Sequence, residues 1–415
     1  MSLSLGRRIA AHVRHEHVVI GAVVVSTFFI GFGGGVVFPI LPNLGEIIGV
    51  SPLLVGVILS ANRFSRLFAN APAGALVDRT GTRAPMVVGM FVQGVATTGY
   101  VVALVAPFPE GWFVLARVCW GLGSALVFAT AFTVAADVGD DGSRGTNMGL
   151  VRGGVLFGFP SGVVLGGIVS ELAGDLWAFV LATVFAFLAS GAAYLLIPET
   201  HVDGESRRSV KPWDLNTSLP ALTVGLVNFA VLFVYIGALL STLVLLLDAR
   251  GFGVLGLGSQ GSSGVFMAVT VLSAGAFMFA GGYVSDRWAS RVPVLLGFLL
   301  VLCLGFVLLA RARSIEALTF ACVCIGAGQG GVSGPLLALL ADLTPGEQMG
   351  RAVGTNNVFG DIGGGLGPVV TLPVVDVSGF WLVYVVCAAL PALAAVVLLV
   401  GVHRETGQLL PAVEL

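Results

Sequence analysis

Apolar positions along the chain gather into twelve long runs that are separated by short polar segments. A helix that crosses a bilayer needs about 20 mostly apolar residues, and each run is close to this length or longer. The pattern therefore predicts an all-α polytopic membrane protein with 12 transmembrane helices. The expected spans are roughly 18–42, 52–77, 84–106, 111–136, 147–170, 176–197, 219–247, 259–284, 292–310, 315–341, 351–375 and 380–402.

One polar segment, residues 198–216, is longer than the others and contains Arg207, Arg208 and Lys211. It divides the predicted spans into six and six. We therefore expect an N-terminal six-helix bundle over residues 1–197, a central loop over 198–216 and a C-terminal six-helix bundle over 217–415.

The basic residues between the spans are distributed unevenly. If the N-terminus is cytoplasmic, the outer loops contain only Arg250, Arg311 and Arg313. Because Arg and Lys collect in cytoplasmic loops, this asymmetry predicts a multi-pass protein of the cell membrane with both termini and the central loop in the cytoplasm. The inner segments contain Arg7, Arg8, Arg14, Arg79, Arg83, Arg144, Arg207, Arg208, Lys211, Arg287, Arg291, Arg351 and Arg404.

The composition argues against several classes of function. Hydrophobic residues make up 57% of the chain and charged residues 10%, whereas soluble domains are roughly 25% charged. The net charge of -2 gives no basis for binding nucleic acid. The five cysteines form no CxxC pair, and no phosphate-binding loop is present, so we expect no metal, no cofactor and no enzymatic activity.

The two halves repeat each other. Residues 74–83 and 282–291 share Gly, Asp, Arg and Arg at a constant offset of 208 residues, which is half the chain. Pro160 and Pro368 have the same offset, and Asp137 and Asp342 follow at an offset of 205. Internal repeats of this parallel kind are typical of secondary transporters.

The segment Gly74–Arg83 resembles motif A of the major facilitator superfamily, and its second copy is typical of that family. Phe38–Pro42 is similar to the end of the first helix in the drug–proton antiporter branch, and Arg117–Ala125 resembles motif B. The resemblance covers the whole chain. It implies two six-helix bundles related by a pseudo-two-fold axis, which rock about a central site.

The chain departs from the antiporter pattern at several positions. The fifth-span signature is here Gly158-Phe-Pro-Ser-Gly162, and a cleaner Gly363-x-x-x-Gly367-Pro368 lies in the eleventh span. Thr82 replaces a commonly basic residue of motif A, and Ala289 replaces a glycine of the second copy. These departures weaken the match to the antiporter branch and leave the match to the superfamily intact.

Motif A suggests a conformational latch. Gly74 and Gly81 allow a tight turn, and Asp78 can accept hydrogen bonds from a helix N-terminus. In the family the matching aspartate engages the eleventh helix when the transporter faces outward. We expect Arg79 and Arg83 to pair with Asp137. The second copy would repeat this with Asp286, Arg287, Arg291 and Asp342; the alternative is that the arginines only anchor the loops inside.

Five ionisable residues lie within spans, where charge is costly and usually marks function. Arg66 lies 12 residues from Asp78, and Asp361 lies 10 residues from Arg351, so both are about 15–18 Å deep. Because the second and eleventh helices adjoin in the family, we predict an Arg66–Asp361 pair. Arg63 is the alternative partner, and a static bridge without a role in coupling is the alternative function.

Two further arginines complete this set. Arg117 matches the motif B arginine, which lines the central cavity or takes part in proton transfer in relatives; the alternative is an arginine that caps carbonyls of a neighbouring helix. Arg152 lies nearer the cytoplasm, and we expect it to snorkel. The resemblance also implies path-lining residues on the first, fourth, seventh and tenth helices, although each could instead pack against a neighbour. These candidates are Phe32, Trp120, Asn228, Tyr235, Gln329 and Ser333.

The sequence therefore predicts a secondary transporter that moves a small organic solute by rocker-switch alternating access, as a proton-coupled exporter. Asp361 is the expected proton carrier, with Glu46 and Asp248 as alternatives. Four arginines against one aspartate within the spans would suit an anionic or neutral substrate. The alternatives are an uptake symporter or facilitator for an organic anion, and a non-transporting sensor or scaffold. We expect the lipid bilayer and a small molecule as partners, and a monomer.

Overall fold

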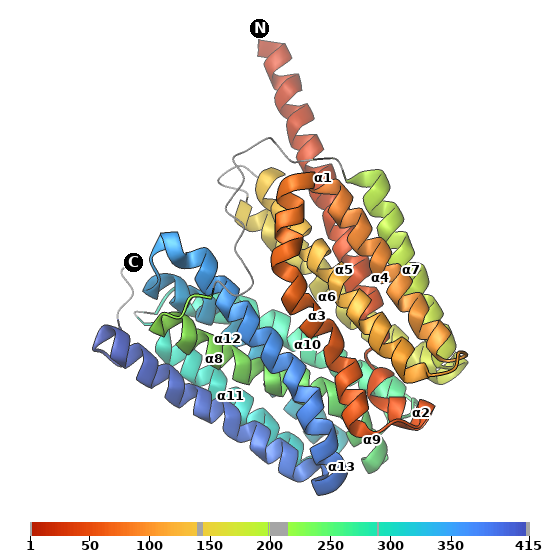
Figure 1. Ribbon diagram of the computed structural model, residues 1–415. Helices are drawn as coiled ribbons and strands as arrows, with labels where there is room; N and C mark the ends of the chain where they lie inside the picture. The colour runs from red at the N-terminus through yellow and green to blue at the C-terminus, as the bar shows by residue number, and fades with distance from the viewer. Residues whose placement is uncertain (1, 139–143, 198, 200–214, 289, 412–415) are drawn as a thin grey trace.

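The computed structural model describes the backbone of residues 2–138, 144–197, 199, 215–288 and 290–411. Side chains are described over the same ranges except for 2–18, 132, 135–138, 144–148 and 152. This part of the chain folds into helices without a strand (Figure 1). In chain order they are α1 (Ser2–Val36), η1 (Leu41–Asn43), α2 (Leu44–Ile48), α3 (Pro52–Thr80), α4 (Arg83–Ala103), α5 (Pro109–Val138), α6 (Arg144–Ala173), α7 (Asp175–Leu196), α8 (Leu219–Leu232), η2 (Phe233–Leu239), α9 (Leu240–Arg250), α10 (Ser259–Ser285), α11 (Val292–Arg311), α12 (Ile315–Leu343) and α13 (Gly346–Thr406).

The helices agree with the predicted membrane spans. Within the described residues, ten helical segments are long and apolar enough to cross a membrane. The segment α13 covers two predicted spans, because its 61 residues are interrupted at Gly379, where φ is 77°. The helix α3 covers the predicted span 52–77 and contains Arg63 and Arg66. An all-α membrane protein with twelve crossings is consistent with this arrangement.

The first span ends earlier than the hydrophobic pattern indicates. The run was expected to extend to residue 42, but α1 ends at Val36 and a short 3₁₀ helix follows at Leu41–Asn43. Pro39 and Pro42 lack the backbone N–H that would continue a helix. The hydropathy pattern alone does not predict that the helix ends here.

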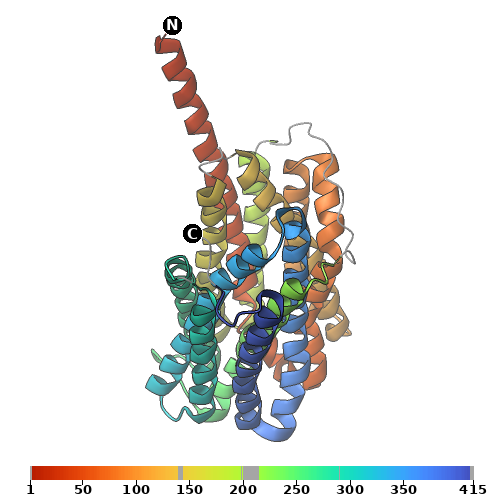
Figure 2. The same ribbon diagram turned by 90° about the vertical axis from the view of Figure 1, so that its left-hand side faces the viewer.

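Figures 1 and 2 show α1 and α3–α7 on one side of the molecule and α8–α13 on the other. Glycines bring helices of each half into close contact. Gly158 and Gly162 of α6 lie against Phe28 and Phe32 of α1, and a Cβ on Gly162 would come 2.0 Å from the Phe32 carbonyl oxygen. Small residues of this kind allow helix backbones to approach closely within a membrane.

The second half repeats this packing. Gly363 of α13 lies against the Phe229 carbonyl of α8, and Gly367 lies against Gly237 of η2. Gly158 and Gly363, like Gly162 and Gly367, are 205 residues apart, close to the 208 residues between Pro160 and Pro368, so the same stretch of each half makes the equivalent contact. The sequence repeat is therefore also a repeat of helix packing.

Among the described residues, the most extensive contacts between the halves are those of α3 with α13 and of α6 with α10, and η1 also contacts α9. We call the end of the molecule where α3 meets α4 and α10 meets α11 the terminal end, and the opposite end the far end. Near the far end the contacts are close, since a Cβ on Gly56 would lie 2.7 Å from the Pro368 carbonyl oxygen, and one on Gly264 would lie 2.6 Å from that of Val163.

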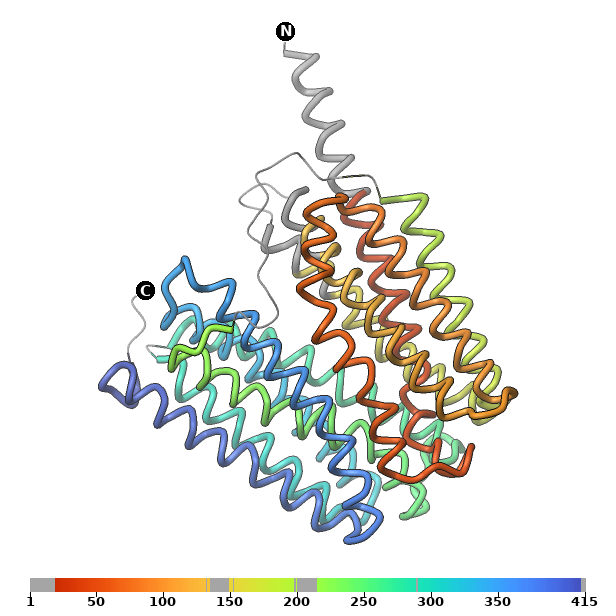
Figure 3. Tube along the Cα trace, viewed as in Figure 1, coloured from red at the N-terminus to blue at the C-terminus, as the bar shows by residue number. Residues whose placement is uncertain are grey.

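Toward the terminal end the same helices separate (Figure 3). Gly74 of α3 and Gly350 and Gly354 of α13 have no atom of another segment within 4 Å of a Cβ position. Gly153 of α6 and Gly282 of α10 are equally open. The halves are therefore joined near the far end and divided near the terminal end.

Candidate functional site

An ion cluster connects the halves midway along α3 and α13. Arg63 and Arg66 are three residues apart on α3, so their side chains share one helix face. Arg63 Nη1 lies 3.4 Å from Asp361 Oδ1, and Arg66 Nη2 contacts the same oxygen. The Asp361 side chain is only 9% exposed. The predicted Arg66–Asp361 pair is confirmed, and the alternative partner Arg63 contributes as well.

The cluster lies between a close and an open part of the α3–α13 contact. On its far side, the Ser60 hydroxyl donates to the Gly365 carbonyl, and Gly364 lies against the Arg63 guanidinium. On its terminal side, α3 and α13 diverge. The Arg66 guanidinium also lies 5.9 Å from the centre of the Phe128 ring of α5. A change in the charge of this cluster would therefore alter the contact between α3 and α13 directly.

Arg117 of α5 is held by α3. Its guanidinium donates to the Leu59 carbonyl at 2.9 Å, to the Ile58 carbonyl at 3.3 Å and to Asn62 Oδ1 at 2.6 Å, and the residue is 3% exposed. It also lies 5.9 Å from the centre of the Trp120 ring. This geometry is the carbonyl-capping alternative, so the predicted role of Arg117 in binding or coupling finds no support in its contacts.

Other predicted path residues are engaged locally. Asn228 Nδ2 donates to the Asn356 carbonyl at 2.9 Å, which links α8 to α13. Gln329 Nε2 donates to Ser333 Oγ at 3.0 Å within α12. Phe32 is 3% exposed and packs against Phe185. Their roles in binding stay predictions.

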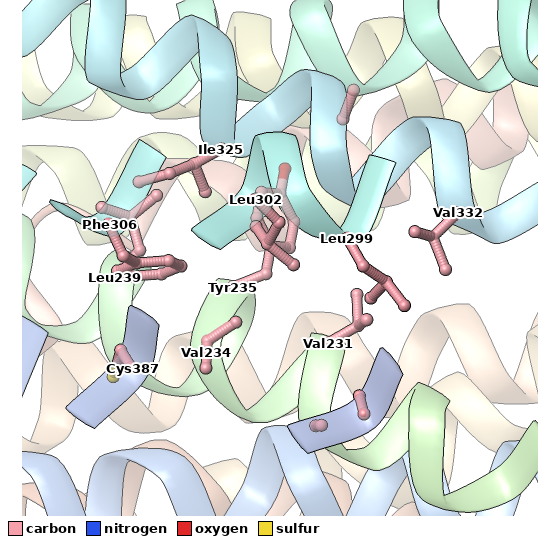
Figure 4. Close-up of a cluster of buried hydrophobic side chains, with 14 of the residues drawn as sticks. Val231, Val234, Tyr235, Leu239, Leu299, Leu302, Phe306, Ile325, Val332 and Cys387 are labelled. Carbon is pink, nitrogen blue, oxygen red and sulfur yellow. The ribbon is translucent and has the colours of Figure 1, made fainter. Parts of the chain in front are cut away.

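Tyr235 occupies a different environment from the one expected. It lies in the π-helical segment η2 and is 6% exposed within the hydrophobic core of the C-terminal half. Figure 4 shows its ring among Val231, Leu299 and Leu302. A substrate-contacting role for Tyr235 therefore has no support in this arrangement, because its side chain packs into the core of the C-terminal half.

The second copy of motif A forms one of the predicted ion pairs, Arg291–Asp342, and Arg291 also pairs with Asp286. Arg291 Nη1 lies 2.9 Å from Asp286 Oδ1, and Arg291 Nε lies 2.5 Å from Asp342 Oδ2. Burial lowers the pKa of Arg291, but its hydrogen bonds to Asp342 and Asp286 outweigh this and raise the pKa above its usual value. Arg287 does not join the pairs; its guanidinium lies 3.4 Å from the centre of the Tyr283 ring.

The first copy is arranged differently. Arg83 Nη2 donates to the Tyr194 carbonyl at 2.8 Å and lies over the Tyr194 ring. The side chain of Asp137 lies outside the described residues, as do Arg152's side chain and Ala289, so the expected pairing of Arg79 and Arg83 with Asp137 stays a prediction. Asp78 and Arg79 are exposed, and neither is paired with another residue in the described part of the chain.

Glu199 is a functional candidate that the sequence did not reveal. Its carboxylate accepts hydrogen bonds from the backbone N–H groups of Thr82, at 2.7 Å, and Arg83, at 3.3 Å, at the start of α4. Gly81, with φ of 86°, lies directly against this carboxylate, and a Cβ there would come within 2.6 Å of it. Gly81 is therefore required at this turn, as predicted, whereas Gly74 has open surroundings.

Glu171 at the end of α6 is the second missed residue. Its carboxylate accepts from the backbone N–H groups of Gly258, at 2.6 Å, and Gly261, at 2.9 Å, at the N-terminus of α10. Asp175 supports this contact, since its Oδ1 accepts from Gln260 Nε2 at 3.3 Å. A carboxylate of the N-terminal half thus closes the far end against the C-terminal half. No local pattern links residues 171 and 258, so only the fold could show this contact.

Comparison with known proteins identifies the family of these helices. The model of the Major Facilitator Superfamily matches residues 23–368 and 257–414. The multi-drug resistance efflux pump PmrA of Streptococcus pneumoniae is 26% identical over 86% of this chain and 90% of its own length. Multidrug resistance protein 1 of Bacillus subtilis is 22% identical over 84% and 87%. An uncharacterised MFS-type transporter of Methanocaldococcus jannaschii is 27% identical over 42% of this chain and less than half, 44%, of its own length.

Solved structures share the fold. The human organic anion transporter MFSD10 has a TM-score of 0.66 at 20% identity, over 92% of this chain and 99% of that one. A bacterial homologue of the human lysosomal transporter Spinster, in an inward-facing and occupied conformation, has a TM-score of 0.76 at 16% identity, over 94% and 97%. Both likenesses concern the arrangement of helices along nearly the whole chain.

Proposed function

Because the chain belongs to the major facilitator superfamily and is embedded in a membrane, we propose that it exports a small organic solute by alternating access in exchange for protons. The observation that carries this proposal is the cluster of Arg63, Arg66 and Asp361. It joins the two halves between the close contact of Gly56 with Pro368 and the open positions of Gly74, Gly350 and Gly354. A cluster in that position is made or strained as the halves rock, whereas a static protein has no need of it.

The described conformation corresponds to one end of that motion. The basic loops lie at the terminal end, so the positive-inside rule puts this end and both termini in the cytoplasm of a cell-membrane protein. The protein is then open inward. The unpaired Asp78 is consistent with this assignment, since the latch expected from motif A forms in the outward-facing state.

Asp361 is the proton carrier in this mechanism. Arginine keeps its proton at physiological pH, so the carboxylate is the member of the cluster that can change its charge. Protonation removes the attraction of Asp361 for Arg63 and Arg66, which weakens the contact between α3 and α13. Release of the proton restores the contact. No cofactor is needed, because the proton gradient supplies the driving force.

The positive charge around the cluster of Arg63, Arg66 and Asp361 favours an anionic or neutral amphiphilic solute. Two guanidinium groups, those of Arg63 and Arg66, contact the single carboxylate of Asp361, and a third, that of Arg117, is held beside Asn62 on the same helix α3. Relatives named as multidrug efflux pumps support export, and the fold of a human organic anion transporter is compatible with the anion class. Uptake or facilitated passage of an organic anion is the second candidate, supported by the same excess of guanidinium groups. We propose a monomer whose partners are this solute and the bilayer.

Transport by purified protein in liposomes tests this proposal. A pH gradient with an acidic lumen should drive accumulation of a pH-insensitive sulfonated rhodamine, an organic anion, while the reversed gradient should not. Asp361→Asn should lose the gradient-driven accumulation and keep the exchange of labelled for unlabelled probe. Asp376→Asn, which removes an exposed carboxylate from the same helix, is the matched control and should behave as the wild type.

The outcomes separate the alternatives. Accumulation only under the reversed gradient would contradict export and indicate a symporter. Equal gradient-driven flux in Asp361→Asn would remove this residue from coupling. Transport of ethidium, a cation, without transport of the rhodamine would contradict the anion class. Flux no greater than that of empty liposomes for both probes would favour a non-transporting sensor or scaffold.

A further inference from the structure

The three arginines that the positive-inside rule assigns to outer loops line one cavity. Arg250, Arg311 and Arg313 were assigned to outer loops that are far apart in the sequence. In the structure all three line a cavity of ≈ 820 Å³ at the far end of the C-terminal half. Its remaining lining is apolar and contains no acidic residue: Phe252, Ala310, Ala312 and Trp381.

The ends of three spans place these side chains. Arg250 is the last residue of α9, Arg311 is the last residue of α11, and Trp381 follows the break in α13 at Gly379. The Arg250 guanidinium donates to the carbonyls of Ala310, at 3.3 Å, and Ala312. It therefore neutralises the partial negative charge at the C-terminus of α11 and holds this helix end beside α9.

Arg311 and Arg313 are available to a ligand. Both are exposed, and neither is paired with another residue in the described part of the chain. Two guanidinium groups beside a third, without a carboxylate in the lining, form a site of positive potential. Guanidinium donors match the oxygens of a phosphate in geometry and charge.

The cavity lies at the depth of lipid headgroups. The apolar helix α11 has 20 residues, so it spans about 30 Å and brings Arg311 to the membrane surface. Trp381 is 59% exposed, as is usual for an aromatic residue at this level. Val385 and Val386, one turn further along α13, are also exposed, which gives an apolar surface for an acyl chain.

We propose that this cavity binds the phosphate headgroup of an anionic phospholipid from the surrounding leaflet. Arg311 and Arg313 contact the phosphate, Arg250 forms the positively charged wall, and an acyl chain follows Trp381 and the apolar face of α13. The adjoining lipid-facing surface favours a phospholipid over a soluble anion. A bound lipid would connect the ends of α9, α11 and α13 and thereby stabilise the C-terminal half.

Native mass spectrometry of the full-length protein tests the site. The probes are dioleoyl phosphatidylglycerol, dioleoyl phosphatidylcholine and inorganic phosphate. We expect the wild type to bind phosphatidylglycerol more tightly than phosphatidylcholine, and Arg311→Gln/Arg313→Gln to weaken the phosphatidylglycerol affinity by roughly 10- to 30-fold. Arg404→Gln, which removes an exposed arginine at the other end of α13, should retain the wild-type preference.

Thermal unfolding and gel filtration test whether the variants are folded. Phosphatidylglycerol should raise the midpoint of thermal unfolding of the wild type and of Arg404→Gln, but not that of the double variant, while all three elute alike in gel filtration. Trp381→Ala should weaken lipid binding and leave the salt dependence of that binding unchanged. Equal affinity of the wild type for both lipids, retention of the preference by the double variant, or competition by free phosphate at equal concentration would each overturn the proposal.

Discussion

Three arginines on neighbouring helices reach partners of two kinds. Arg63 and Arg66 meet a carboxylate of the other half, whereas Arg117 donates to acceptors on α3 in its own half. A charged group inside a membrane must find such partners, because an unpaired one costs several kcal/mol. In the proposed rocking motion the first two contacts would change and the third would not. Residue type alone therefore does not separate a coupling charge from a structural one.

Replacement of Arg117 should act on stability. Arg117→Ala removes the charged donor of Asn62 and an additional donor of two α3 carbonyls that also accept within the helix, and each hydrogen bond to a charged group contributes roughly 1.5–3 kcal/mol. We expect a loss of about 3 kcal/mol, visible as a lower unfolding midpoint in detergent, while flux per folded molecule persists. Unchanged stability together with lost flux would instead support the cavity role predicted from motif B.

Asp361 should be coupled energetically to Arg66. Asp361→Asn leaves two guanidiniums without their counter-charge, and loss of one partner of a fully buried pair costs about 3–5 kcal/mol. Because Arg63 and Arg66 are 16% and 22% exposed, we expect a smaller cost of about 1–3 kcal/mol. Adding Arg66→Gln to Asp361→Asn should recover part of it in thermal unfolding. Strictly additive effects of the two changes would contradict the coupling.

At the scale of helices, glycine spacing decides which pairs approach closely. Gly158 and Gly162 of α6 face α1, and Gly363 and Gly367 of α13 face α8 and η2. These contacts lie within the halves, so the proposed rocking motion would leave them intact. The antiporter-like signature near Pro160 thus serves here as a packing surface, and its irregular glycine spacing follows the contacts with α1.

A single methyl group should distinguish a packing glycine from a free one. Gly162→Ala places a Cβ 2.0 Å from the Phe32 carbonyl oxygen, and overpacking of this kind typically costs about 1–3 kcal/mol. Gly191→Ala in α7 meets no other segment within 4 Å and should be neutral or stabilising by up to about 1 kcal/mol, because alanine favours the helix. Thermal unfolding of both variants checks this contrast; a Gly162→Ala protein as stable as Gly191→Ala would refute the packing role.

For the whole molecule, Glu171 and Asp78 are two carboxylates at opposite ends, and only Glu171 contacts a helix N-terminus in the described conformation. Glu171 of α6 binds the start of α10 at the far end in the described conformation. Asp78 at the terminal end is unpaired there and is expected to engage only in the other conformation. Each contact favours one conformation, since a charge at a helix terminus contributes about 0.3–2 kcal/mol.

The two substitutions should shift the conformational equilibrium in opposite directions. Glu171→Gln should favour closure of the terminal end, and Asp78→Asn should disfavour it, each by between about twofold and thirtyfold. Spin labels at Thr80→Cys and Glu347→Cys, in a background without the native cysteines, report the distance across that end. Shifts of the same sign in both variants would contradict the proposed division of roles.

Hydropathy and spacing predicted the long apolar helices, the repeat of the two halves and the matching heights of Arg66 and Asp361, which the ion pair confirms. These properties depend on distance along the chain, and a helix converts that distance into depth at about 1.5 Å per residue. The direction in which a side chain points around its helix, and the helix that it meets there, depend on tertiary packing. Only the structure therefore decided that Arg117 caps α3, that Tyr235 faces its own core, and that Glu171 closes the far end.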